Sequence, residues 1–319
     1  MTRTVRTLTR IAAALLALCG LVVAVPSAAH AAGWRYTVVA FSGATDRTMD
    51  VYESDDATSF TVLQKAAYSP PTGRVRDPSI FRAADGEYYV TYTTANGATI
   101  GFARSSDRVH WTKIGDYGVP YCCFLLPGTG DGHASVPGFG STGSLLREVP
   151  SLSPFTTKAW APEWFVDGGR VNVILSMSTG GGFVPYLMTA LDSTFTRWSL
   201  PTPLDGIGAD HIDTTVVKIG STYHAFTKNE TKKVIQHAVA TSLAGPYRFV
   251  PAGDWGTLVE GPELVQLPDG AWRIFLDAYT KGKYLYADST DGLDTWTPLR
   301  EVPGLSGAAR HIGIMREAS

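Results

Sequence analysis

The sequence predicts an all-β protein with the architecture of a five-bladed β-propeller. Short segments that alternate between apolar and polar residues follow one another, and turns rich in Gly, Pro and Asp separate them about every 8 to 12 residues. Helical periodicity is almost absent. Two different hairpin patterns also repeat along the chain, with the period of a four-stranded propeller blade.

The first repeated pattern is an inner hairpin, seen most clearly in residues 76–92. It has a polar start, a run of strand-forming residues, an Asp-Gly turn and a second strand of aromatic and β-branched residues. The same plan recurs in residues 160–175, 212–226 and 260–275. Alignment of the four hairpins makes four positions equivalent, with Glu260 one residue ahead of the last: Asp77, Ala161, Asp213 and Gly261.

The second pattern is an outer hairpin, in which a turn containing Ser or Asp precedes an aromatic residue that packs the blade. It occurs five times, at Phe60, Trp111, Trp198, Tyr247 and Trp296. Successive aromatics are 51, 87, 49 and 49 residues apart, so one blade-sized interval carries a long insertion. The insertion lies between Trp111 and Trp160 and contains Cys122, Cys123 and a glycine-rich run.

Five outer hairpins but only four inner ones imply that the two chain ends share one blade. Its outer part is residues 36–64, and residues 310–315 supply the missing inner strand. Closure by both ends leaves the ring without an open sheet edge.

The N-terminal residues have the pattern of a secretory signal peptide. Three arginines precede an apolar run, and a small-residue cleavage signal ends at Ala31. The rival interpretation, a membrane anchor, requires roughly 20 apolar residues, and this run has only about 15. We therefore expect residues 1–31 to be a signal peptide, residues 32–319 to form one propeller domain, and the protein to be secreted.

The charge balance excludes some partners. Without residues 1–31, the chain carries 24 Lys and Arg against 29 Asp and Glu, a formal charge of about −5. Such a balance does not indicate binding to nucleic acid or to an anionic membrane surface. We expect a monomer that acts on an oligo- or polysaccharide, for the reason given next.

Carboxylates from different blades converge in this arrangement. The starts of the innermost strands meet at one mouth of the axis, which places Asp77, Asp213, Glu260 and His311 together, beside Trp160. A single Asp at a strand start is usually a turn or cap residue. Three crowded carboxylates suit glycoside hydrolysis, which uses a base, a protonated acid and a group that holds the acid's pKa up.

Five motifs make the sequence similar to glycoside hydrolase family 43 over nearly the whole chain after residue 31. They are Arg-Asp-Pro-Ser-Ile-Phe, Trp-Ala-Pro-Glu, Ile-Asp-Thr-Thr, Glu-Gly-Pro-Glu and Arg-His-Ile-Gly, in the family's order and spacing. The resemblance implies a five-bladed propeller that hydrolyses arabinofuranosides or xylosides of plant cell walls, such as arabinan and arabinoxylan, with inversion at the anomeric carbon. The sequence departs from the family at Thr214, where proline is usual, and at Glu163, where many members have aspartate.

The same resemblance implies residue roles. Asp77 resembles the general base, Asp213 the aspartate that modulates the acid's pKa, and Glu260 the general acid. His311 resembles an axial histidine that holds a cation, calcium or sodium, with water completing the shell. No organic cofactor is implied.

Other residues have two interpretations each. Trp160 either stacks on a sugar or packs in the core, Phe183 is a candidate for the pocket rim, and Arg310 for contact with a sugar hydroxyl. Strand alternation predicts that Glu163 and Glu263 point away from the axis. Cys122 and Cys123 form either a vicinal disulfide or two thiols.

Three rival functions are open to a propeller of this kind. A retaining fructanase shares the Arg-Asp-Pro motif but needs an earlier nucleophilic Asp, for which the first blade offers only Asp46 and Asp50. A sialidase-like enzyme needs an arginine triad, which is not evident. A non-catalytic carbohydrate-binding propeller has no need of three axial carboxylates.

Overall fold

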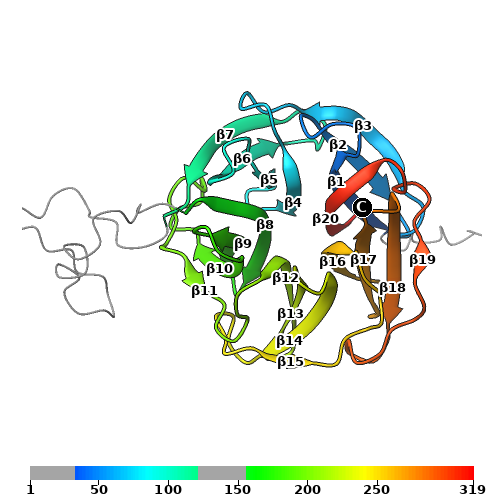
Figure 1. Ribbon diagram of the computed structural model, residues 1–319. Coiled ribbons are helices and arrows are strands. Elements are labelled where there is room, and N and C mark those ends of the chain that lie inside the picture. The colour runs from blue at the N-terminus through cyan, green and yellow to red at the C-terminus, as the bar shows by residue number, and fades with distance from the viewer. Residues whose placement is uncertain (1–32, 121–155) are drawn as a thin grey trace, which may run out of the picture. The chain divides into compact units, whose positions relative to one another are not determined.

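The computed structural model describes residues 33–120 and 156–319, and every regular element in them is a strand. The strands form five four-stranded antiparallel sheets arranged around a central axis (Figure 1), which confirms the five-bladed propeller. No helix among these residues is long and apolar enough to cross a membrane. The expected leader at residues 1–31 and the cysteines Cys122 and Cys123 lie outside the described residues.

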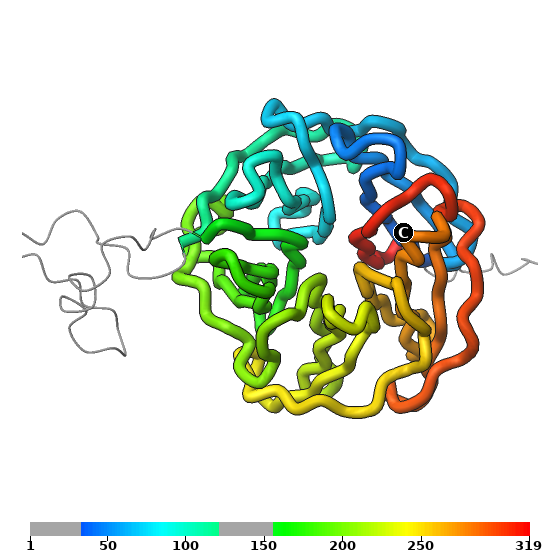
Figure 2. The backbone as a smooth tube through the Cα atoms, in the orientation of Figure 1, coloured from blue at the N-terminus to red at the C-terminus, as the bar shows by residue number. Residues whose placement is uncertain are grey.

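The first blade is shared by the two ends of the described chain, as expected. It contains, from the axis outward, β20 (Ala309–Ala318), β1 (Trp34–Ser42), β2 (Met49–Ser54) and β3 (Thr61–Tyr68). The blue and red ends of the tube in Figure 2 run side by side here, where β1 pairs with β20 in antiparallel fashion.

Each of the other four blades is one continuous segment of sequence. The second contains β4 (Arg76–Arg82), β5 (Tyr88–Thr93), β6 (Thr99–Ser105) and β7 (Thr112–Gly118). The third contains β8 (Lys158–Asp167), β9 (Arg170–Ser178), β10 (Val184–Thr189) and β11 (Thr202–Pro203). The fourth contains β12 (His211–Ile219), β13 (Thr222–Asn229), β14 (Val234–Ala240) and β15 (Arg248–Val250). The fifth contains β16 (Glu260–Gln266), β17 (Trp272–Ala278), β18 (Lys283–Ser289) and β19 (Arg300–Glu301).

The apolar core is divided among the contacts between neighbouring blades. Five buried clusters occur in the described residues, each with members from two adjacent sheets. In one, Tyr36 and Tyr52 of the first blade pack with Phe275 and Tyr284 of the fifth. Because both faces of most sheets are covered, the strands are apolar on both sides, and burial of this surface holds the ring together.

The Ser/Asp turns have the packing role expected of them. Asp107 Oδ1 accepts hydrogen bonds from the backbone N–H groups of Val109 and His110, which closes the turn. Trp111 then donates its Nε1 hydrogen to the carbonyl of Arg108. The equivalent Trp198 stacks on Phe102 of the second blade, with ring centroids 5.3 Å apart, so these aromatics join blades.

The innermost strand of every blade carries a β-bulge at the same place. The ladder register shifts there, and the first bulge residue has left-handed backbone geometry. The φ angles are 49° at Asp77, 47° at Ala161, 55° at Asp213, 55° at Gly261 and 36° at His311. Four of the five residues carry a side chain, although such angles are unfavourable for all but glycine. The four aligned hairpin positions and His311 thus share one left-handed backbone geometry, which is unfavourable for Asp77, Ala161, Asp213 and His311.

Candidate active site

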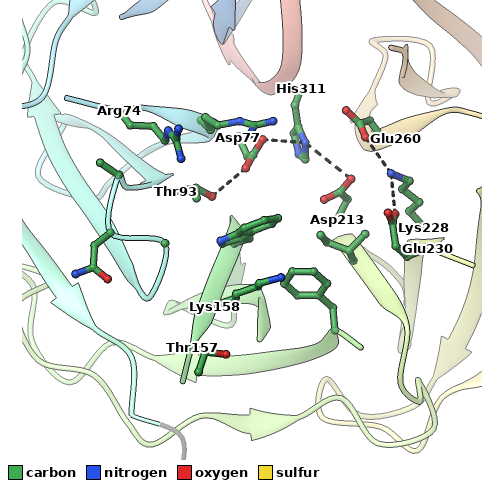
Figure 3. Close-up of a pocket in the computed structure, with 17 residues that line it drawn as sticks. Arg74, Asp77, Thr93, Thr157, Lys158, Asp213, Lys228, Glu230, Glu260 and His311 are labelled. Atoms are coloured by element: carbon green, nitrogen blue, oxygen red, sulfur yellow. Dashed lines mark hydrogen bonds and ion pairs between the residues drawn. The ribbon is translucent and has the colours of Figure 1, made fainter. Parts of the chain in front are cut away.

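The bulges surround a pocket of about 370 Å³ at one end of the axis. Figure 3 shows Asp77, Asp213, Glu260 and His311 converging on it from four blades. Trp160 and Phe183 also line it, so six of the seven residues proposed from the sequence meet there. The remaining lining residues are Arg74, Arg76, Thr93, Ala95, Asn96, Gly97, Thr157, Lys158, Ile212, Lys228 and Glu230.

Polar residues on the second strands hold the bulges in place. In three blades, a side-chain oxygen on the second strand accepts the backbone N–H of the bulge residue in the next blade. The pairs are Thr93 with Ala161 at 2.9 Å, Ser176 with Asp213 at 3.1 Å, and Asp277 with His311 at 3.1 Å. The fourth second-strand residue is Lys228, which has no acceptor, and there Asp213 Oδ2 accepts the N–H of Gly261 at 3.3 Å. Buried backbone donors are thus satisfied around the site.

Asp77 is held by two groups. Its Oδ2 accepts a hydrogen bond from Thr93 Oγ1 at 2.9 Å, and its Oδ1 lies 3.4 Å from His311 Nδ1. His311 is buried, and burial alone lowers its pKa, but Asp213, Asp77, Glu260 and Glu163 raise it to a net value above the ordinary one. An imidazolium at this position places a positive charge beside the Asp77 carboxyl group.

Asp213 differs from Asp77 in its surroundings. Only 7 % of the residue is exposed, and burial is the main cause that raises its pKa to about 6. The negative charges of Glu260 and Asp77 raise it further, while His311 and Lys228 oppose the shift. Asp213 consequently takes up a proton more readily than an ordinary aspartate does.

Glu260 lies between two cations. Its Oε2 accepts from Lys228 Nζ at 2.9 Å and its Oε1 from Arg310 at 2.8 Å. Burial raises the pKa of Glu260, but Lys228, His311 and Arg310 together bring it below its ordinary value. Lys228 also pairs with Glu230 at 2.9 Å, so it joins two carboxylates on this side of the pocket.

Arg310 is placed behind Glu260. It donates to Asp277 Oδ2 at 2.6 Å as well as to Glu260, and Asp277 is only 1 % exposed. Both of its described ion pairs are therefore with carboxylates, and the one with Glu260 orients that side chain, while the Arg310 guanidinium also lies 5.7 Å from the Phe41 ring centroid. Contact of Arg310 with a sugar hydroxyl stays a prediction.

Two aromatic rings form one wall. Trp160 and Phe183 have ring centroids 5.1 Å apart and planes inclined at 39°. The ammonium group of Lys158 lies 5.1 Å from the Trp160 ring centroid and 5.3 Å from that of Phe183. Aromatic faces of this kind are suited to the apolar face of a sugar.

The expected orientation of Glu163 and Glu263 is wrong. They belong to the third and fifth blades, yet their carboxyl groups hydrogen-bond to each other, and Ser79 of the second blade donates to Glu163 at 2.6 Å. The bulge inserts one residue and so resets the alternation, which turns both side chains toward the axis. Burial, the charge of Glu163 and their hydrogen bond raise the pKa of Glu263 well above its ordinary value, so the pair retains a proton.

A metal ion bound directly by protein does not fit the axial residues. No group of three or more His, Cys, Asp or Glu in the described part of the chain is arranged to hold one. His311 directs Nδ1 toward two carboxylates, at 3.4 Å and 4.0 Å, and its raised pKa favours the imidazolium, which cannot ligate. No chemical step below uses a metal.

The sequence interpretation missed Thr93, Lys228, Glu230 and Asp277. A signal existed, since Thr93, Ser176, Lys228 and Asp277 follow the bulge residues of their own blades by 15 or 16 positions. Each pairs across the ladder with the residue just before the bulge residue of its own blade: Arg76, Trp160, Ile212 and Glu260. The recurrence of a polar residue at the end of an otherwise apolar strand could have identified them.

The family comparison agrees with this geometry. Residues 34–316 match the model of a glycoside hydrolase 43-related family, described as a probable glycosyl hydrolase domain. The chain belongs to this family. With the five-bladed fold, this makes the protein a glycoside hydrolase family 43 propeller, as the motifs indicated.

Several known proteins are similar to this family 43 chain. An α-L-arabinofuranosidase of Bifidobacterium longum subsp. longum is 24 % identical over 190 residues, which are 50 % of this chain and 15 % of the relative. A family 43 β-1,3-galactosidase solved with galactodeoxynojirimycin has a TM-score of 0.61 at 13 % identity, covering 83 % of this chain and 90 % of its own. An exo-β-1,3-galactanase of Clostridium thermocellum has a TM-score of 0.60 at 13 % identity, covering 87 % and 62 %.

The chain matches only part of some of these relatives, and the structural matches have low sequence identity. The chain spans less than a sixth of the length of the curated relative and 58 % of another family 43 β-1,3-galactosidase, which has a TM-score of 0.61 at 10 % identity. At 10 to 13 % identity, the structural likeness shows a shared fold, and a fold hosts many specificities.

Proposed function

We propose that this protein is a secreted glycosidase that cleaves arabinofuranosidic or xylosidic bonds of plant cell-wall polysaccharide with inversion at the anomeric carbon. The observation that carries the proposal is the meeting of Asp77, Asp213 and Glu260 around one pocket. Support for arabinofuranosides comes from the motifs and from the similarity to an arabinofuranosidase over half of the chain. Export rests on the pattern of residues 1–31.

Asp77 is the proposed base. Thr93 fixes its Oδ2 by a hydrogen bond, and His311 Nδ1 lies 3.4 Å from its Oδ1. It would take a proton from a water molecule as that water attacks the anomeric carbon from the face opposite the leaving group.

Glu260 is the proposed acid, and its free-state electrostatics set a condition for that role. With Lys228 and Arg310 bound, Glu260 is an anion before substrate arrives. A sugar that fills the pocket excludes water, which raises the pKa of a buried carboxyl group. Lys228 has Glu230 as a second partner and can release Glu260 without losing its counter-charge. Glu260 would then take up the proton that it delivers to the leaving oxygen.

Asp213 is the proposed modulator. It is close enough to Glu260 for the charge of that carboxylate to raise the pKa of Asp213. At a pKa of about 6, a fraction of the Asp213 side chains is protonated near neutral pH. Ionisation of Asp213 while the sugar is bound makes loss of the Glu260 proton less favourable until the leaving oxygen accepts it.

The decisive experiment identifies the product and its first anomeric form. The purified protein is incubated with aryl arabinofuranosides, xylosides and galactosides, and with arabinan, arabinoxylan and β-1,3-galactan, and proton NMR follows the released sugar. Release of arabinose or xylose with inverted configuration supports the proposal. First-formed sugar of retained configuration contradicts the mechanism, release of galactose alone contradicts the substrate, and Asp77→Ala, which should release nothing, is the control.

A further inference from the structure

The charges that line the pocket are unevenly paired. On one side, Lys228 and Arg310 are paired with Glu260, Glu230 and Asp277, so these positive and negative charges face each other. Figure 3 shows Arg74 at the opposite side, beyond Asp77. Three lining cations belong to this second group: Arg74, Arg76 and Lys158.

Within the described residues, Arg76 and Lys158 have no anionic partner, and Arg74 has one, through a single nitrogen atom. Arg74 uses only Nε, which lies 2.9 Å from Asp46 Oδ2. No hydrogen bond or ion pair of the described chain engages the Arg76 guanidinium, whose Nε is buried and unpartnered and whose centre lies 5.1 Å from the Phe41 ring centroid. In the part of the chain that the structure describes, the Lys158 ammonium group contacts only the Trp160 and Phe183 rings.

The backbone aims the two arginines at the same space. Val75, which is fully buried, separates Arg74, two residues before β4, from Arg76, the first residue of β4, and both arginines line the pocket. Lys158 begins β8 in the neighbouring blade. Arg74, Arg76 and Lys158, here called the cationic wall, therefore adjoin both the aromatic pair and the proposed base.

We propose that this cationic wall binds a sugar unit that carries an oxyanion, either the carboxylate of a uronic acid or a sulfate ester, next to the bond that is cleaved. A neutral sugar supplies hydroxyl acceptors but no negative charge, so the desolvation of Arg76 and Lys158, which have no anionic partner in the described residues, is unfavourable. An oxyanion supplies the missing charge, and arginine presents two parallel N–H groups that match a carboxylate or sulfate. This inference rests on the proposed glycosidase function, because it describes the substrate of the same pocket.

Binding of free monosaccharides tests the wall without any need for hydrolysis. Glucuronic acid, galactose 6-sulfate and uncharged glucose are titrated into the full protein, and affinity is measured by calorimetry or NMR. We expect at least one charged sugar to bind about tenfold or more tighter than glucose, the size of one charge-assisted hydrogen bond. Roughly 0.5 M NaCl should reduce this advantage. A uronate advantage alone or a sulfate advantage alone identifies which oxyanion is used.

Variants locate the effect. The double variant Arg74→Gln, Arg76→Gln should lose the preference for the charged sugar, whereas Arg248→Gln, an exposed arginine on β15, should keep it. Equal affinity for charged and neutral sugars in the wild type would overturn the inference. A preference that survives in the double variant would overturn it as well.

Hydrolysis separates this inference from the proposed function. Pairs of arabinosyl or xylosyl oligosaccharides are compared, identical except that one member has its uronic acid carboxyl reduced to an alcohol. Cleavage of both at equal kcat/KM contradicts the cationic wall and leaves the glycosidase function standing. Binding of charged sugars without cleavage of any glycan supports the wall and contradicts the proposed function.

Discussion

Thr93 Oγ1 donates a hydrogen bond to Asp77 Oδ2 at 2.9 Å, and the same oxygen accepts the backbone N–H of Ala161 from the next blade, also at 2.9 Å. One hydroxyl group thus ties the proposed base to the backbone bulge of a neighbouring sheet. The threonine is only 4 % exposed, so water does not replace it readily. The position of the base is consequently set by the contact between two blades.

The substitution Thr93→Val should therefore impair both stability and catalysis. Valine keeps the shape but leaves the Ala161 N–H without an acceptor, which we expect to cost about 1–3 kcal/mol of unfolding free energy. Loss of a hydrogen bond to the charged Asp77 should lower kcat/KM by roughly 10- to 100-fold. Chemical denaturation and steady-state kinetics measure the two effects. Thr202→Val, at an exposed position on β11, is the matched control, and equal behaviour of the two variants would refute the linkage.

Removal of either proposed proton-transfer group should have a different signature. Asp77→Ala removes the base and should abolish activity on every substrate, because no other group activates the water. Glu260→Ala removes the acid and should spare aryl glycosides with good leaving groups, which need little protonation. The kcat values on activated and unactivated glycosides provide the measurement. If Glu260→Ala loses the same factor on both classes, the assignment of the acid is incorrect.

The hairpin repeats were sufficient to predict the ring and its closure, because each blade is built from local strand pairs with their own turn signals. Alignment of the hairpins also found Asp77 and Asp213, and the expected closing strand placed His311 beside them, since the same bulge occurs at each equivalent position. The bulge itself was not visible in the pattern of polar and apolar residues, and so the orientation of Glu163 and Glu263 was predicted incorrectly. A single inserted residue reverses the face of every side chain after it.

The electrostatics of the site depend on contacts between blades that no local pattern contains. Lys228 of the fourth blade donates a hydrogen bond to Glu260 of the fifth. Arg310, on the C-terminal strand of the first blade, donates one to Asp277 of the fifth. The family resemblance implied a protonated Glu260 as the acid, whereas these cations lower its pKa. Ion pairs between neighbouring blades therefore help to decide whether Glu260 holds a proton in the free protein.

Metal removal tests the axial cation implied by the resemblance. Since His311 faces Asp77 and Asp213, and no three-ligand site occurs in the described chain, we expect excess EDTA to leave Tm and kcat unchanged. Addition of calcium after chelation should likewise have no effect. A fall in Tm or kcat that calcium restores would instead show that a water-held ion contributes at the axis.

The buried pair of Glu163 and Glu263 should make stability depend on pH. Burial and the neighbouring Glu163 raise the pKa of Glu263, with the phenol of Tyr284 also close enough to interact, while His311 faces Glu163. A carboxyl group whose pKa is raised on folding binds more protons in the folded state. Its contribution is fully present below the unfolded pKa of 4.5 and is lost as the pH rises from there through the folded pKa.

The substitution Glu263→Gln should remove this dependence. The amide has the size of the protonated acid and can donate to Glu163, but no proton has to be retained on folding. We expect the variant to gain, relative to wild type, about 1.4 kcal/mol of unfolding free energy for each pH unit above 4.5, up to the pKa of the folded pair. Urea denaturation from pH 4.5 to 8 measures the slope, and Glu87→Gln, near the Asp-Gly turn of the second blade, should keep the wild-type slope. Parallel curves for wild type and Glu263→Gln would show that the pair does not share a proton.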